Sequence, residues 1–212
     1  MALMVVAGLG LDPWDVFHQG VARATGLSLG GVVIAAGAVV LLLWVPLRQR
    51  PGLGTVSNVI VVGLVVDRTL AVLPVPHQLP PRMAYLVAGI LANAVATGLY
   101  LGAGLGPGPR DGLMTGLARR GHSIRAVRTS IEVTVLAVGW ALGGTVGVGT
   151  VLYAAAIGPL VHVLIPRLAA PGAPAGAAGP RRRRGRRAPG LRPATPPASR
   201  SGPRPARPAR SA

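Results

Sequence analysis

The sequence predicts an all-α fold, a polytopic membrane helical bundle made of two related halves, and three observations predict it. Half of the 212 residues are apolar, the mean hydropathy is +0.53, and 13% are charged, whereas a soluble domain has about 25% charged residues. Long apolar stretches recur throughout residues 1–168, and one short phrase occurs twice there. Such a repeat in so apolar a chain is typical of membrane proteins built from duplicated halves.

The repeated phrase occupies residues 7–23 and 103–119, so its copies lie 96 positions apart, and they agree at 9 of 17 positions. Both copies begin Ala-Gly-Leu-Gly and continue with a Pro and an Asp at fixed positions. A second match, between 52–56 and 147–151, has an offset of 95 and lies at the start of an apolar stretch in each half. The two matches divide the membrane domain into repeat one, 1–76, and repeat two, 83–168.

Five apolar stretches approach or reach the roughly 20 residues, with a range of about 17–25, that cross a bilayer. They are 29–47, 55–73, 83–105, 127–142 and 150–164, the last extendable to 168. A full stretch precedes the phrase in repeat two, but only six residues precede it in repeat one. We therefore expect a natural domain of two three-span repeats whose first span is truncated here. A misassigned start codon is the simplest cause, and a genuine five-span variant is the alternative.

An odd number of spans in each half would make the second half enter the membrane from the opposite side, which gives inverted repeats. The Arg distribution sets the orientation, because cytoplasmic loops carry the excess of basic residues. The loops at 48–50 and 110–128 and the chain after 167 are basic and fall on one side of this arrangement. We therefore expect a multi-pass protein of the bacterial cell (cytoplasmic) membrane with a cytoplasmic C-terminal tail.

This tail, 169–212, is rich in Arg, Pro and Ala, and 11 of the 22 Arg residues lie between positions 181 and 210. A segment with so few apolar residues cannot bury a core and is expected to be disordered. Its charge indicates binding to anionic lipid headgroups, at about 1 kcal/mol per Arg near the surface. Because no folded domain or aromatic residue accompanies it, we expect no specific nucleic-acid binding.

The repeated phrase predicts a chain break followed by a short helix. Asp12 and Gly108 suit the N-cap position before a Pro in the first turn, and Asp15 and Asp111 fall near the third helical position, where a carboxylate favours the positive helix end. A helix of about 12 residues is roughly 18 Å long and too short to cross, so each phrase marks a re-entrant or interfacial helix. Such helix ends build substrate sites in transporters. A structural turn left by the duplication is the other interpretation.

Ionisable residues within or near the spans are further candidates, because their insertion costs about 2.5–3.5 kcal/mol and they usually face protein or a cavity. Glu132 follows Arg128 by four residues, so the two can pair on a helix. Asp67 and Arg68 can lie near the outer interface and snorkel. Structural pairing and proton or substrate handling are the alternatives for these groups. His18, on the first short helix, either titrates near neutral pH or lies on a polar helix face.

Several function classes are disfavoured by patterns that the sequence lacks. The chain has no Cys, which excludes disulfides and Cys-based metal sites or nucleophiles. It has no phosphate-binding P-loop, no His-Glu metal pattern and no Ser-His-Asp set, and its Gly-rich phrases lack the strand that a dinucleotide site needs. We expect no enzyme activity, no cofactor and no metal site.

A resemblance to a known family rests on the motif Gly-Leu-Gly-Leu-Asp-Pro-Trp-Asp-Val-Phe-His-Gln-Gly at 8–20, the Thr-Gly pair at 25–26, and Arg-Gln-Arg-Pro-Gly-Leu-Gly-Thr at 48–55. These residues resemble the YczE-like bacterial membrane proteins, which are related to the YitT group. The resemblance covers residues 1–168 and implies a polytopic membrane protein, and some members of this group are classed with exporters.

The sequence favours a small-molecule transporter or exporter whose path is lined by Asp15, His18, Asp111, Glu132 and Asp67, with the two phrases facing each other near the middle of the membrane. The alternative is a non-transporting membrane protein that assists or scaffolds another enzyme or a secretion system. The candidate partners are the lipid bilayer, a small-molecule substrate and, in a homodimer, a second copy of the chain.

Overall fold

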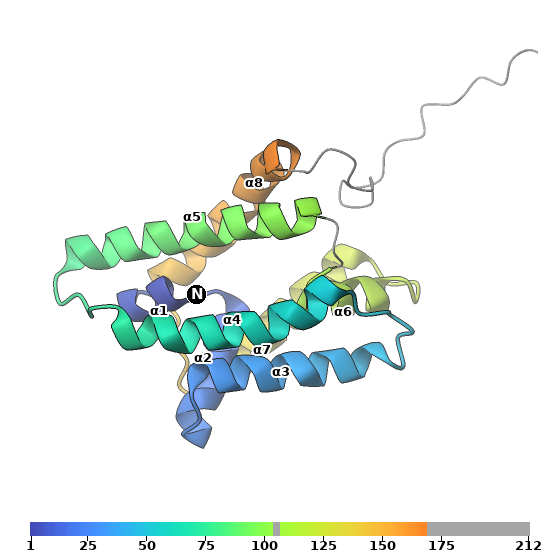
Figure 1. The fold of residues 1–212 in the computed structure, drawn as a ribbon, viewed down its shortest axis with the longest axis horizontal. Coiled ribbons are helices and arrows are strands. Elements are labelled where there is room, and N and C mark those ends of the chain that lie inside the picture. The colour runs from blue at the N-terminus through green and yellow to red at the C-terminus, as the bar shows by residue number, and fades with distance from the viewer. Residues whose placement is uncertain (104–106, 169–212) are drawn as a thin grey trace, which may run out of the picture. The chain divides into compact units, whose positions relative to one another are not determined.

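The computed structural model describes residues 1–103 and 107–168, and in this part of the chain it consists of α-helices joined by loops, with no strand (Figure 1). The helices are α1 (Ala2–Ala7), α2 (Pro13–Thr25), α3 (Leu29–Trp44), α4 (Leu53–Val72), α5 (Leu79–Ala103), α6 (Pro109–Ala118), α7 (Ile124–Ala141) and α8 (Val148–Leu168). The predicted all-α fold is therefore confirmed for these residues. The predicted tail, 169–212, and the last residues of the predicted span 83–105 lie outside the described part.

The short helices α2 and α6 begin where the repeated phrase predicts. The Asp12 carboxylate accepts hydrogen bonds from the backbone N–H groups of Trp14 (3.0 Å) and Asp15 (3.1 Å), and this caps α2. Gly10 has a φ of 118°, a conformation that residues with a side chain rarely adopt, and the turn it makes separates α1 from α2. With 13 and 10 residues, α2 and α6 are too short to cross a bilayer.

The helix order of the first half recurs in the second half. α2 begins at Pro13 and α6 at Pro109, 96 residues later, while α4 begins at Leu53 and α8 at Val148, 95 residues later. The first helices differ, because α1 has 6 residues and its counterpart α5 has 25. The duplication seen in the sequence is thus also a duplication of helices.

Each half packs its short helix on a long helix of the other half. α2 lies against α7, and α6 lies against α3. Arg23, near the end of α2, donates a hydrogen bond to the carbonyl of Gly143 after α7. In the other half, Arg120 after α6 donates to the carbonyl of Pro46 after α3 (2.6 Å). The C-terminal end of each short helix is thus bonded to the other half.

The buried apolar residues gather around the two phrases. One cluster joins Leu11 and Val16 of the first phrase to Leu86 of α5. The other joins Trp14 to Trp44 of α3 and to Leu113 of α6. The core therefore packs the beginnings of both short helices against α3 and α5.

The halves differ in how their last two helices pack. α3 and α4 lie close together, and a Cβ added at Gly37 or Gly63 would come within 2.8 Å of Val59 or 2.5 Å of Ile34. The residue that follows Gly37 by 95 positions is Glu132 on α7, and α7 makes no comparable contact with α8. Glu132 thus carries a large charged side chain where α3 has a glycine, and α7 and α8 stay apart where α3 and α4 touch.

By length and composition, three helical segments are able to cross a membrane: α4, the part of α5 from Leu79–Tyr100, and α8. α2 and α3 add a fourth crossing if the pair, which is bent by 114°, forms one broken span. α7 is not among these, because it carries two Arg residues and Glu132 within 18 residues. The five predicted spans therefore correspond to five helices, but three or four crossings are supported.

The outer sides of these helices are apolar and exposed. Leu64 of α4 is 57% exposed and Val151 of α8 is 70% exposed, and many Val and Leu side chains share this environment. A soluble monomer rarely exposes contiguous apolar surface on this scale. Lipid chains would cover such a surface without cost, which agrees with a membrane protein.

Candidate functional site

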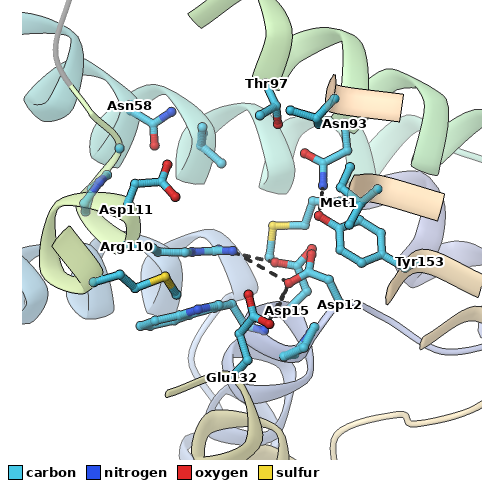
Figure 2. A pocket seen from close by; sticks show the side chains of 18 of the residues that line it. Met1, Asp12, Asp15, Asn58, Asn93, Thr97, Arg110, Asp111, Glu132 and Tyr153 are labelled. Carbon is cyan, nitrogen blue, oxygen red and sulfur yellow. Dashed lines mark hydrogen bonds and ion pairs between the residues drawn. The ribbon is translucent and has the colours of Figure 1, made fainter. Parts of the chain in front are cut away.

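A cavity of about 690 Å³ lies among the helices and receives residues from both halves. Its walls include the beginnings of α2 and α6, the inner sides of α3, α4 and α5, and residues of α7 and α8. Figure 2 shows polar side chains of several helices directed toward this space. Because α7 and α8 stay apart, the space is not filled by their packing.

The two copies of the repeated phrase meet at this cavity. Asp12 and Asp15 line it from the first copy, and Pro109 and Asp111 line it from the second. Both carboxylates of the first copy are buried, with exposures of 4% and 3%. The structure therefore brings together two segments that lie about a hundred residues apart in the sequence, as the repeat led us to expect.

Arg110 links the two copies. Its Nη2 lies 3.5 Å from Asp15 Oδ1 and its Nη1 lies 3.7 Å from Asp12 Oδ1, and Figure 2 shows these contacts as dashed lines. Its guanidinium also lies over the ring of Trp14, 5.1 Å from the ring centroid, within the range of a cation–π interaction. Trp14 and Arg110 occupy equivalent positions of the phrase, 96 residues apart, so equivalent positions contact each other.

Two carboxylates share this single guanidinium. One oxygen of Asp12 accepts the hydrogen bonds that cap α2. Asp15 lies near His18, whose Nδ1 is 3.7 Å from Asp15 Oδ1. Isolated buried charges are costly unless they are paired and hydrogen-bonded. The N-terminal amine of Met1, which also lines the cavity, acts on Asp15 as a second positive charge.

His18 is buried within the protein, with 2% exposure, and packs beside Trp14 and Phe17. The polar helix face that we considered for it is therefore not an exposed one. Among the buried side chains that the structure describes, His18 Nδ1 and Trp14 Nε1 have no hydrogen-bond partner. Unpaired buried polar atoms are uncommon in proteins and need a physical explanation.

Asp111 has a different environment from its equivalent Asp15. The hydroxyl of Tyr100 on α5 donates a hydrogen bond to Asp111 Oδ2. The neighbouring carbonyl of Pro109 accepts a hydrogen bond from Trp44 Nε1 (3.1 Å). The second phrase is therefore held by side chains of α5 and α3, while the first phrase holds the guanidinium.

Glu132 lines the cavity from α7 and is paired with Arg128, whose Nε donates to Glu132 Oε1 over 2.9 Å. This is the i, i+4 pair that the spacing predicts. The two side chains are 34% and 59% exposed, so the pair lies at the open side of the cavity.

Asp67 lies apart from the other candidates. It is not among the residues that line the cavity, and its Oδ1 accepts a hydrogen bond from the backbone N–H of Gly30 over 2.7 Å. It therefore satisfies a backbone amide in the first turn of α3. Its equivalent on α8, His162, does line the cavity.

Sequence reasoning missed the importance of Arg110 and of the two Gly-x-Gly-Thr motifs. Thr55 donates a hydrogen bond to the carbonyl of Pro107 in the second phrase (2.8 Å). At the equivalent place in the other half, the N–H of Gly149, next to Thr150, donates to the carbonyl of Leu9 in the first phrase (2.8 Å). The repeated Gly-x-Gly-Thr motif was the available signal, since each copy holds the phrase of the other half.

Comparison with known proteins places this chain among membrane proteins. A model of a family of unknown function, DUF6198, matches residues 1–166. An uncharacterized protein of Haemophilus influenzae is 44% identical over 164 residues, which are 77% of this chain and 75% of that protein. The uncharacterized membrane protein YczE of Bacillus subtilis is 31% identical over 161 residues, which are 75% of each chain. The uncharacterized protein YyaS of the same organism is 26% identical over 173 residues, which are 78% of this chain and 85% of YyaS. No solved structure matches significantly.

Proposed function

The chain belongs to the DUF6198 family and is a YczE-like membrane protein, and from this premise we propose that it carries a small molecule across the membrane. The cavity between the two copies of the phrase supports this proposal. Its volume of about 690 Å³ falls within the roughly 300–1,000 Å³ of small-molecule sites. A protein that only assists another enzyme or a secretion system needs no such space.

The arrangement of the halves supports a transport role in a second way. We propose that a pseudo-two-fold axis in the membrane plane passes through the cavity and relates the halves as inverted repeats. Each short helix packs on the other half, and each Gly-x-Gly-Thr motif bonds the other half's phrase. Transporters with inverted repeats bind their substrates at the interface of the repeats, beside the ends of broken helices.

The orientation follows from the basic loops. We place the protein in the bacterial cell membrane with the loops 48–50 and 110–128 in the cytoplasm, where positively charged loops collect. The tail then lies in the cytoplasm as well, and its Arg residues would contact anionic lipid headgroups. The end of α2 would face outward and the end of α6 inward.

Contacts across the cavity identify where the halves would separate. The ion pairs of Arg110 with Asp12 and Asp15 join the two phrases over 3.5–3.7 Å, longer than the 2.7–2.9 Å of a strong charge-assisted hydrogen bond. Movement of one half against the other breaks these contacts at moderate cost. We therefore propose that substrate reaches the cavity when this junction opens.

A single-cysteine experiment tests the proposed function without knowledge of the substrate. The chain has no Cys, so Thr97→Cys introduces one thiol on α5 at the cavity. We expect a membrane-impermeant maleimide to label it both in right-side-out and in inside-out vesicles, because a transporter opens its site to each side in turn.

The matched control is Leu91→Cys on the same helix, where the side chain is 47% exposed on the apolar surface and outside the cavity. It should stay unlabelled from both sides, since lipid excludes the charged reagent. Labelling of Thr97→Cys from one side alone would contradict transport and favour a non-transporting protein.

A further inference from the structure

The cavity carries more acidic than basic groups. Its lining contains the carboxylates of Asp12, Asp15, Asp111 and Glu132, the guanidinium groups of Arg110 and Arg128, and Met1, whose N-terminal amine acts on Asp15. Since Arg128 and Glu132 pair with each other, the imbalance lies at the two phrases, where three carboxylates face one guanidinium and one amine. A buried excess of this kind favours a ligand of positive charge.

Building on the proposed transport function, we propose that the cavity binds an organic cation, which takes the place of Arg110 between Trp14 and the carboxylates of Asp12 and Asp15. Arg110 itself shows that the site accepts such a group. Its planar cation lies over the indole ring and within 4 Å of both carboxylates.

Arg110 is held loosely enough to be displaced. Its contacts of 3.5 and 3.7 Å are long for charge-assisted hydrogen bonds, and its side chain is 35% exposed while the two carboxylates are almost fully buried. The carboxylates and the indole are therefore the buried partners, and the guanidinium is the more exposed one.

Two buried nitrogen atoms support a ligand site independently of charge. Trp14 Nε1 and His18 Nδ1 have no hydrogen-bond partner among the described residues, although both side chains are more than nine-tenths buried and line the same cavity. The indole N–H can only donate a hydrogen bond, so a ligand that carries an acceptor atom beside its positive charge would satisfy it. An anion is disfavoured there, because the guanidinium of Arg110 already contacts the carboxylates of Asp12 and Asp15.

The test compares two ions of the same shape and opposite charge on the full chain in detergent micelles. Tetraphenylphosphonium should bind saturably to the protein, and tetraphenylborate should bind at least about tenfold more weakly, which is the change expected from one charge-assisted contact. Equal or tighter binding of tetraphenylborate would overturn the proposal, whatever the behaviour of any variant.

Variants locate the binding. Asp15→Asn should weaken tetraphenylphosphonium binding about tenfold, whereas Arg110→Gln, by removing the internal competitor, should strengthen it. The controls are Asp67→Asn, a carboxylate outside the cavity, and Arg119→Gln, an exposed residue at the end of α6. Unchanged binding in Asp15→Asn would remove the proposed site, and the elution profile of each variant checks that it is folded.

The outcome is separable from that of the proposed function. If Thr97→Cys is labelled from both sides but tetraphenylphosphonium does not bind, the transport function stands and the cation proposal is wrong. If tetraphenylphosphonium binds through Asp15 but the cysteine is labelled from one side only, the cation site stands and transport is wrong.

Discussion

Trp14 and Arg110 show how duplication can make one site from two copies of the same segment. They occupy equivalent positions, yet one is an aromatic residue and the other a cation. The guanidinium of Arg110 lies 5.1 Å from the centroid of the Trp14 ring. The sequence predicted Asp12 and Asp15 correctly as a cap and a first-turn carboxylate, because both roles depend on local spacing. It could not predict the role of Arg110, since that depends on which segment of the other half lies opposite.

His18 and Asp67 illustrate the same limit. Local pattern placed His18 on a short helix, but its burial depends on Trp14, Phe17 and the other half of the protein. Asp67 was singled out because a carboxylate within a span is unusual, and the structure gives it the amide of Gly30 at the start of α3. A charged residue within a span thus indicated that a polar partner exists, but the sequence did not identify that partner.

At the same scale, Thr55→Val tests the contact between halves at a single hydroxyl. Thr55 is fully buried and donates to the carbonyl of Pro107, so its replacement leaves that carbonyl without this donor. We expect the free energy of unfolding in detergent to fall by about 1 kcal/mol. Thr134→Val is the control, because Thr134 is exposed and bonds only within its own helix. Equal effects of the two changes would show that the contact does not join the halves.

At the scale of helices, the sequence predicted where the short helices begin, but not which of the longer helices can cross the membrane. The phrase places an N-cap residue before a Pro in both halves, and α2 and α6 begin there. The stretch 127–142 was expected to span, but its helix α7 includes two Arg residues and Glu132. Charged side chains on a helix that borders a cavity can face that cavity and avoid lipid. The length of an apolar stretch alone therefore overestimates the number of membrane crossings.

The equivalent glycines Gly63 on α4 and Gly158 on α8 provide a test of the asymmetry between the halves. A Cβ at Gly63 would approach Ile34 to 2.5 Å, whereas nothing lies within 4 Å of a Cβ at Gly158. We expect Gly63→Ala to lower the free energy of unfolding by about 1–3 kcal/mol through overpacking. Gly158→Ala should leave it unchanged or raise it by up to about 1 kcal/mol, since Ala favours helix.

Unfolding of both variants in a denaturing detergent, followed by circular dichroism, measures the difference. A larger loss in Gly158→Ala than in Gly63→Ala would mean that α7 and α8 pack closely, which would contradict the cavity described here.

At the scale of the molecule, the repeat in the sequence anticipated the duplicated helix order and the meeting of the two phrases, since both follow from a duplication. It did not reveal the cavity, whose lining includes Gly37 of one half and, at the equivalent position of the other half, Glu132. Departures from the repeat therefore carry as much functional information as the repeat itself. The halves provide the scaffold, and their differences provide the site.

The central claim is that two inverted halves surround this site, and the ends of the short helices test it most directly. Leu27 and His122 follow α2 and α6, are both exposed, and lie 95 positions apart in the repeat. In the Cys-free chain we expect Leu27→Cys to react with an impermeant maleimide only from outside the cell and His122→Cys only from the cytoplasmic side. Labelling of both thiols from the same side would contradict the inverted arrangement and the transport mechanism built on it.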